Sequence, residues 1–150
     1  MKKICFVLLA ICLLTGTACK KENKSLVNTK WKLISILDVE TCAVTELEPK
    51  DCQECYTLEF LKDDIIYTFS CSNGYTGNYL IDYNKNSLNV GSFLGTRRNE
   101  LWGGKLYIHL LESIQSFSIE KKELYLYYND KKNRDYTPSY CNPLIAFSQK

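Results

Sequence analysis

Residues 56–83 read Tyr-Thr-Leu-Glu-Phe-Leu-Lys-Asp-Asp-Ile-Ile-Tyr-Thr-Phe-Ser-Cys-Ser-Asn-Gly-Tyr-Thr-Gly-Asn-Tyr-Leu-Ile-Asp-Tyr. Apolar and polar side chains alternate on both sides of Lys62-Asp63-Asp64, and Ser72-Asn73-Gly74 separates a further alternating run. Successive side chains of a strand point to opposite faces, so this alternation indicates strands with one buried face. The stretch predicts consecutive antiparallel strands joined by tight turns.

The pattern continues on both sides of this stretch, with one interruption. Between Asn99 and Ile114 the apolar residues recur at three- and four-residue spacing, which indicates one amphipathic helix. Its firm part should begin near Lys105, because Gly103 and Gly104 weaken the first turns. Further strands are predicted at residues 31–37, 88–90, 116–120, 124–128 and 144–148.

The composition agrees with a β-rich domain. The chain has 11 Tyr, 6 Phe and 2 Trp in 150 residues, and such aromatic content favours strands. We therefore predict a mainly β fold with one helix (α+β), an antiparallel meander of roughly seven or eight strands. It should curl into a partly open β-barrel, with the late amphipathic helix plugging or covering one end. A flatter sheet packed on the helix is the structural alternative.

The first 18 residues are organised like a signal peptide. Lys2 and Lys3 form a basic region, residues 4–14 carry no charge, and Gly16-Thr17-Ala18 provides small residues before Cys19. The apolar run is shorter than the roughly 20 residues of a membrane-spanning helix. A cysteine directly after such a site resembles the lipobox of bacterial lipoproteins, which implies cleavage before Cys19 and lipid on its thiol.

This interpretation divides the chain into residues 1–18 as signal peptide, 19–28 as a lipidated tether and 29–150 as the folded domain. Lys20 stands where an Asp retains lipoproteins at the inner membrane of enteric bacteria. We therefore expect a lipid-anchored protein of the bacterial cell envelope, at the outer membrane. Ordinary secretion is the alternative, in which Cys19 is an unmodified disulfide cysteine.

The charge balance excludes one class of partner. Without the leader, Lys plus Arg falls from 19 to 17 and equals the 17 Asp plus Glu. A nucleic-acid-binding surface needs an excess of basic residues, so no nucleic-acid partner is expected.

Short motifs along the folded part resemble the META-domain family of bacterial envelope and heat-shock-associated lipoproteins. They are Trp31-Lys32-Leu33, Asn73 followed by Gly77-Asn78-Tyr79, Thr96, Glu100 entering a helix that ends near Leu110-Leu111, Leu124-Tyr125-Leu126 and Ile145-Ala146-Phe147. The resemblance covers nearly all of residues 29–148. It implies a small cracked β-barrel with one helix and no established catalytic residues. A lipocalin-like barrel is the nearest competing fold.

Outside the leader and Cys19, the cysteines available for disulfides in an oxidising compartment are Cys42, Cys52, Cys55, Cys71 and Cys141. Cys71 and Cys141 each adjoin a predicted strand end, so we predict a bond between them. We predict a second bond from Cys42 to Cys52 or Cys55, which leaves one thiol free.

Cys52-Gln53-Glu54-Cys55 is the one motif with catalytic potential. A C-x-x-C pair exchanges disulfides when a helix N-terminus lowers its thiol pKa. Here a predicted strand follows, and Glu54 opposes thiolate formation, so we interpret the pair as structural. No histidine lies nearby, and neither a metal site nor a cofactor is predicted.

The other polar residues form no catalytic set. His109 is the sole histidine, and no nucleophile-elbow pattern accompanies it. Asp63 and Asp64 are interpreted as turn residues, and Arg97 and Arg98 as part of a solvated loop.

A stripe of tyrosines has two interpretations, either barrel core with hydroxyls at the rim or a groove for a glycan, peptide or lipid. Its members are Tyr75, Tyr79, Tyr83, Tyr125 and Tyr127.

With a full domain and no catalytic set, we predict a non-enzymatic envelope lipoprotein whose β domain binds or supports another envelope component. One alternative is a thiol-disulfide oxidoreductase that uses Cys52 and Cys55. The other is a lipocalin-like carrier of a small apolar ligand.

Overall fold

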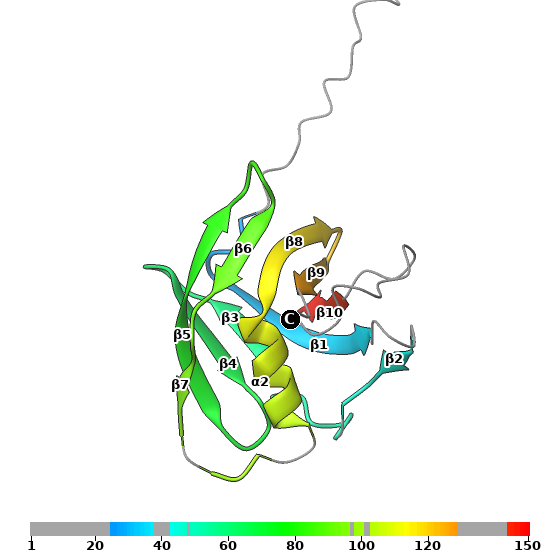
Figure 1. Cartoon of the computed structure of the whole chain (residues 1–150). Helices are drawn as coiled ribbons and strands as arrows, with labels where there is room; N and C mark the ends of the chain where they lie inside the picture. The colour runs from blue at the N-terminus through cyan, green and yellow to red at the C-terminus, as the bar shows by residue number, and fades with distance from the viewer. Residues whose placement is uncertain (1–24, 38–42, 48, 97, 101–102, 129–143) are drawn as a thin grey trace, which may run out of the picture.

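The computed structural model describes residues 25–37, 43–47, 49–96, 98–100, 103–128 and 144–150 (Figure 1). Its strands are β1 (Thr29–Leu37), β2 (Val44–Thr45), β3 (Thr57–Phe60), β4 (Ile65–Phe69), β5 (Gly74–Asp82), β6 (Ser87–Val90), β7 (Leu94–Gly95), β8 (Ile114–Glu120), β9 (Glu123–Tyr128) and β10 (Leu144–Gln149). The helix within these residues is α2 (Gly104–Glu112).

The alternating stretch forms β3, β4 and β5 as predicted. In β4, Ile66 and Thr68 are buried between half-buried neighbours. The φ angles of Asp63 and Asp64 are 58° and 57°. These are the left-handed values of a type I′ turn, whose twist matches that of the two strands it joins. Both aspartates are therefore turn residues, as expected.

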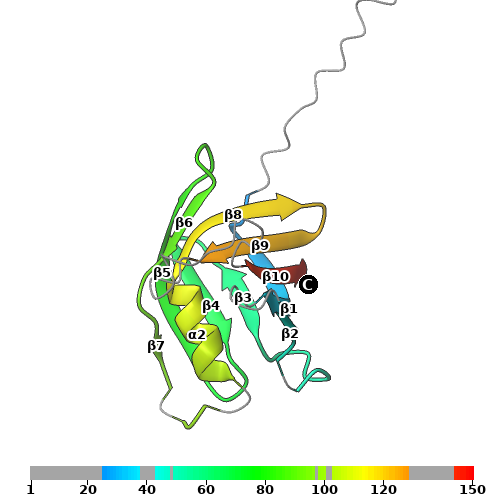
Figure 2. The same cartoon turned by 45° about the vertical axis from the view of Figure 1, so that its right-hand side comes forward.

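Eight of the strands close into a ring, which can be followed in Figures 1 and 2. The antiparallel order is β1–β3–β4–β5–β6–β8–β9–β10, and β10 returns to β1 through six register pairs that begin at Trp31↔Gln149. β6 and β8 share only one register pair, Ser87↔Ser116. The predicted fold class, mainly β with a barrel and one helix, is confirmed.

The helix forms where the three- and four-residue spacing predicts it. α2 begins after Gly103, whose φ of 80° glycine adopts without strain, and it buries Tyr107 and Leu111. In both views α2 lies at the lower end of the barrel (Figures 1 and 2). The Tyr107 hydroxyl donates to the Thr57 carbonyl at 3.2 Å and lies 3.0 Å from the Thr68 hydroxyl. The helix therefore inserts a side chain into the barrel.

Aromatic rings fill the barrel interior. Tyr79 meets Phe60 edge to face with ring centres 5.2 Å apart, and Tyr107 meets Tyr56 at 5.3 Å. The largest fully buried side chains are Tyr56, Tyr79, Tyr107, Phe60, Phe147, Leu26, Leu58, Ile66, Leu88, Leu111, Leu124 and Leu126. Because strands and helix all contribute to this set, the interior is a packed core.

The segment before β1 is also packed, which corrects the predicted tether. Leu26 is fully buried, and its N–H donates to the Tyr83 hydroxyl at 2.9 Å. The Asn28 N–H donates to the Phe60 carbonyl at 2.7 Å. Residues 26–28 therefore belong to the barrel. Burial of the apolar Leu26 side chain stabilises this arrangement, whereas a solvated tether would leave that side chain in water.

We expect Leu26→Ala to lower the free energy of unfolding by about 2 to 3 kcal/mol, since a buried leucine leaves a cavity when truncated. Val27→Ala is the matched control, because the neighbouring Val27 is exposed, and its effect should stay below about 0.5 kcal/mol. Urea denaturation measures both. Equally small effects would show that residues 26–28 are a free tether after all.

Candidate functional site

Three sulfur atoms meet at the open end of the β3–β4 hairpin. The last register pair of the hairpin is Thr57↔Phe69, and Cys55 and Cys71 stand two residues further along the two chains. The hairpin pairing holds the two segments side by side, and the two cysteines meet just beyond its end. Their Sγ atoms are 2.7 Å apart. With Cys52, all three Sγ atoms lie within 4.8 Å of one another.

The sulfur pairing differs from the prediction. Cys52 is bonded to Cys55, with Cα atoms 5.4 Å apart, and Cys71 is a free thiol. The predicted bonds from Cys42 to Cys52 or Cys55, and from Cys71 to Cys141, are therefore wrong. Cys42 and Cys141 lie outside the described residues. The β3–β4 hairpin holds Cys71 beside Cys55, and the C-x-x-C turn by itself reaches disulfide distance.

Lys32 and Tyr56 surround these sulfurs. Lys32 Nζ donates to the Cys52 carbonyl at 2.8 Å and to the Cys55 carbonyl, and lies 5.9 Å from the centre of the Tyr56 ring. The φ angles of Tyr56 and Cys71 are 52° and 145°. Side chains rarely adopt such values, which cost conformational energy and are enriched at functional sites. Backbone strain is therefore present on both sides of the cluster.

The sulfur cluster favours a protonated thiol. Burial raises the pKa of the Cys71 thiol, the Lys32 charge opposes this rise and the Glu100 charge adds to it. Burial, with the charges of Cys71 and Glu100, raises the pKa of Tyr56 to about 12. Burial lowers the pKa of Lys32. Chemically, a thiol beside a disulfide can exchange with it, and three reduced sulfurs can offer soft ligands to Zn²⁺ or Cu⁺.

A second polar cluster holds the segment before α2. The Glu100 carboxylate accepts hydrogen bonds from the Ser70 hydroxyl at 2.8 Å, the Asn73 amide at 2.5 Å and the Tyr75 hydroxyl. Burial and the bond to Glu100 raise the pKa of Tyr75 to about 12. A methyl group on Gly104 would stand 2.0 Å from Glu100 Oε2, so glycine is needed there.

Asn73 connects this cluster to Thr96 and Arg98, which follow β7. Its side chain is almost fully buried, and its amide oxygen accepts from the Thr96 hydroxyl at 2.6 Å and the Arg98 N–H at 2.9 Å. Its amide nitrogen also donates to the Arg98 carbonyl at 2.9 Å. Asn73, Thr96 and Glu100 belong to the motifs of the family resemblance. The three donors on the Glu100 carboxylate indicate that it positions the segment.

The predicted tyrosine groove is not one surface. Tyr79 is buried in the barrel, whereas Tyr125 and Tyr127 lie on the outer face of β9, between buried residues. Tyr75 and Tyr83 are partly exposed and hydrogen-bond to distant parts of the chain. The sheet itself therefore separates the stripe into inner and outer members.

The other polar residues considered in the sequence analysis do not form one cluster. His109 is exposed on α2, and Arg98 is exposed before it. Asp63 and Asp64 occupy their turn. Arg97 lies outside the described residues.

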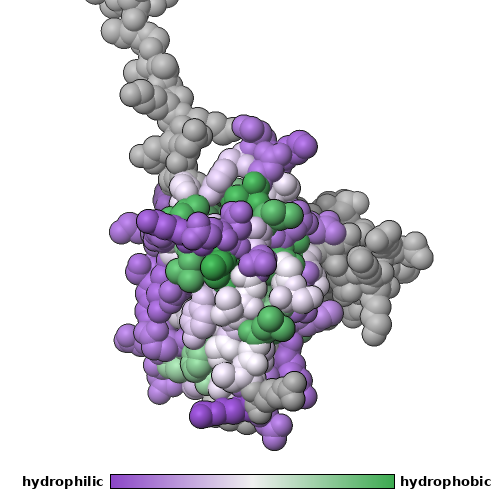
Figure 3. All heavy atoms as spheres, turned by 90° about the vertical axis from the view of Figure 1, so that its left-hand side faces the viewer, coloured by the Kyte–Doolittle hydropathy of each residue, from purple (hydrophilic) through white to green (hydrophobic). Residues whose placement is uncertain are grey.

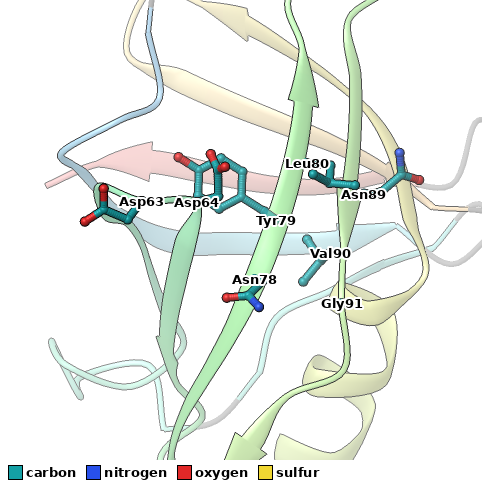
Figure 4. A pocket seen from close by; sticks show the side chains of 8 residues that line it. All are labelled: Asp63, Asp64, Asn78, Tyr79, Leu80, Asn89, Val90 and Gly91. Carbon is teal, nitrogen blue, oxygen red and sulfur yellow. The ribbon is translucent and has the colours of Figure 1, made fainter.

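The described residues form a larger and a smaller surface hollow, among others. The larger, about 550 Å³, has Asp63 and Asp64 on one side and β5 and β6 on the other (Figure 4). Figure 3 faces the left-hand side of the molecule as seen in Figure 1 and shows separate apolar areas among polar ones. Leu80, in this hollow, is 71% exposed. The smaller hollow, about 220 Å³, is lined in part by Lys32 and Tyr56 and so adjoins the sulfur cluster.

The sequence itself indicates that Cys71 lies near Cys55, although the predicted disulfides did not use this. Cys55 and Cys71 stand at equal distances before and after Asp63 in the predicted turn, so hairpin pairing about that turn places them opposite each other. No comparable signal marks Lys32 or Tyr56, because their approach depends on the pairing of β1 with β3.

Comparisons with known proteins find similar chains, and each similarity covers most of both chains. A protein of Tannerella forsythia named "Putative lipoprotein" is 26% identical over 137 residues, which cover 87% of this chain and 92% of that protein. An NMR structure of a protein from Burkholderia xenovorans has a TM-score of 0.64, with 18% identity and 83% of each chain covered. The crystal structure of a DUF4847 family protein from Bacteroides vulgatus has a TM-score of 0.58 and 11% identity, over 82% of this chain and 93% of that chain.

The two solved structures share the fold with this chain. No family model matches the sequence, so the META-domain resemblance stays a prediction. Among the described residues, no helix is long and apolar enough to cross a membrane.

We expect Asn73→Ala to lower the free energy of unfolding by about 1 to 3 kcal/mol, because Thr96, Arg98 and Glu100 lose hydrogen-bond partners. Asn78→Ala is the control, since Asn78 is exposed on β5, the strand that follows Asn73, and it should change the free energy of unfolding by less than about 0.5 kcal/mol. Thermal or urea unfolding compares the two. If Asn73→Ala is as stable as Asn78→Ala, the hydrogen-bond network does not hold the segment.

Proposed function

We propose that this chain is a lipid-anchored lipoprotein of the bacterial envelope whose barrel is a non-enzymatic module that binds or supports another envelope component. The similarity to the T. forsythia protein named as a lipoprotein carries the proposal, since it extends over most of both chains. The leader and Cys19 supply the corresponding chemistry in this sequence, although Cys19 lies outside the described residues. The outer membrane is the proposed location.

The packed interior favours binding on the outside of the barrel. A lipocalin-like carrier needs an open lumen for its ligand, whereas Tyr79, Tyr107 and Phe147 lie fully buried inside this ring. The described hollows open on the outer wall. A protein or glycan partner that contacts the β5–β6 face therefore fits the geometry better than a ligand enclosed in the barrel.

The position of Leu26 supports a proposal for which end of the barrel would face the membrane. Leu26 and Asn28 are bound beside Tyr83 and Phe60, near the β3–β4 and β5–β6 turns. The seven residues from Cys19 to Leu26 span at most about 25 Å when extended. A lipid on Cys19 would hold this turn end near the bilayer and leave α2 at the far end.

We expect Cys19→Ser to move the protein from the membrane fraction to the soluble fraction, since each buried acyl CH₂ contributes about 0.8 kcal/mol to membrane binding. Cys71→Ser, a matched change in the folded domain, should stay with the membranes. Mass spectrometry of the N-terminal peptide provides the direct readout. An unmodified Cys19 in membrane-extracted wild-type protein would refute the lipid anchor.

A photo-crosslinking residue at Leu80 should give a discrete adduct in intact cells, because Leu80 is 71% exposed beside the larger hollow. The same residue at Lys105, which is exposed on α2, is the control and should give none. Gel shift followed by mass spectrometry identifies the adduct. Identical patterns at both positions, or no adduct at Leu80, would argue against a partner on the β5–β6 face.

A further inference from the structure

The sulfur cluster contains three cysteines, and its disulfide uses only two of them. One disulfide joins Cys52 to Cys55, and Cys71 remains a thiol with its sulfur 2.7 Å from that of Cys55. This separation lies between a covalent S–S bond, about 2.05 Å, and the roughly 3.5–4.0 Å of unbonded carbon atoms in contact. Cys55 is therefore within reach of two partners.

We propose that Cys52, Cys55 and Cys71 form a thiol-disulfide exchange centre in which one disulfide alternates between Cys52–Cys55 and Cys55–Cys71. The inference goes beyond the proposed function and does not depend on the lipid anchor. In the forward step the Cys71 thiolate attacks Cys55 Sγ, the S–S bond to Cys52 breaks, and Cys52 leaves as a thiolate. The proton lost by Cys71 is regained at Cys52, so the step needs no external oxidant or reductant.

The strand register supports the second bond. Residues directly opposite in an antiparallel pair have Cα atoms about 4.5–5.5 Å apart, within the usual range for disulfides of about 4.4–6.8 Å. Cys55 and Cys71 stand two residues beyond the last register pair, Thr57↔Phe69, and their Sγ atoms are already 2.7 Å apart. The exchange can therefore proceed without a change of strand pairing.

The surroundings of Cys52 support its departure. The Cys55 N–H donates to Cys52 Sγ at 3.2 Å, and a hydrogen bond to the charged form stabilises a thiolate. Lys32 Nζ, bound to the Cys52 carbonyl at 2.8 Å, places a positive charge on the same loop. The φ angles of 52° at Tyr56 and 145° at Cys71 show backbone strain beside the sulfurs, of the kind that is enriched at functional sites.

The exchange would give Cys52 a chemical role. The shift moves the free thiol from Cys71 to Cys52, both of which are half-buried, whereas Cys55 stays in the disulfide and is 2% exposed. A thiol or disulfide of another envelope protein is the substrate class that such a group could engage. Because burial raises the pKa of Cys71, exchange should be slow at neutral pH and faster in alkaline buffer, where more thiolate is present.

Peptide mapping of the full detergent-extracted protein tests the proposal. The protein is held at pH 9 without reductant, blocked with iodoacetamide and cleaved with trypsin after Lys50, Lys62 and Lys85. A Cys52–Cys55 bond then stays inside the peptide 51–62, whereas a Cys55–Cys71 bond links 51–62 to 63–85. A further cut after Glu54 assigns the sulfur within 51–62. We expect both species, with label on Cys71 in the first and on Cys52 in the second.

Single substitutions provide matched controls. Cys52→Ser should contain only the Cys55–Cys71 bond, and Cys71→Ser only the Cys52–Cys55 bond, each with a circular dichroism spectrum like that of the wild type. Two results would overturn the proposal: label confined to Cys71 in the wild type, or no Cys55–Cys71 bond in folded Cys52→Ser. A bond from Cys71 to Cys141 in the wild type would overturn it as well.

Discussion

The pairing of β1 with β10 joins the two ends of the folded domain, and the barrel depends on it. Trp31 opposes Gln149 and Leu37 opposes Leu144, so a single antiparallel ladder closes the ring. Closure covers edges that would otherwise present unpaired N–H and C=O groups. It also directs the inner faces of eight strands toward one interior, where Tyr107 of α2 completes the packing.

Because buried side chains fill the interior, a partner can reach the barrel only at its wall or its ends. The sulfur cluster lies where the β3–β4 hairpin opens, and Lys32 reaches it from the outer side of β1. Leu26 is bound near the opposite end of β3. The anchor proposed for Cys19 and the exchange proposed for Cys55 thus use separate parts of one rigid ring. This separation would let a membrane-held barrel present its sulfurs to other envelope proteins.

The polar cluster around Glu100 gives a structural role to three residues of the predicted META-domain motifs, Asn73, Thr96 and Glu100. Asn73 uses both atoms of its amide to hold the segment that leads into α2, and Gly104 leaves room for the Glu100 carboxylate. Buried polar groups need partners, and here Ser70, Asn73 and Tyr75 supply them from one segment and Thr96, Arg98 and Glu100 from another. The motif residues Asn73, Thr96 and Glu100 can therefore recur for structural reasons without marking an active site.

The sequence by itself determined the strands of the ring, the turn at Asp63 and Asp64, and the position of the helix, because alternation, turn residues and helical spacing are local properties. Only the tertiary structure decided that Leu26 is packed, that Tyr79 is separated from Tyr125, and which sulfurs meet. These outcomes depend on register and ring closure between segments far apart in the chain, and local patterns carry no information about which segment lies opposite which.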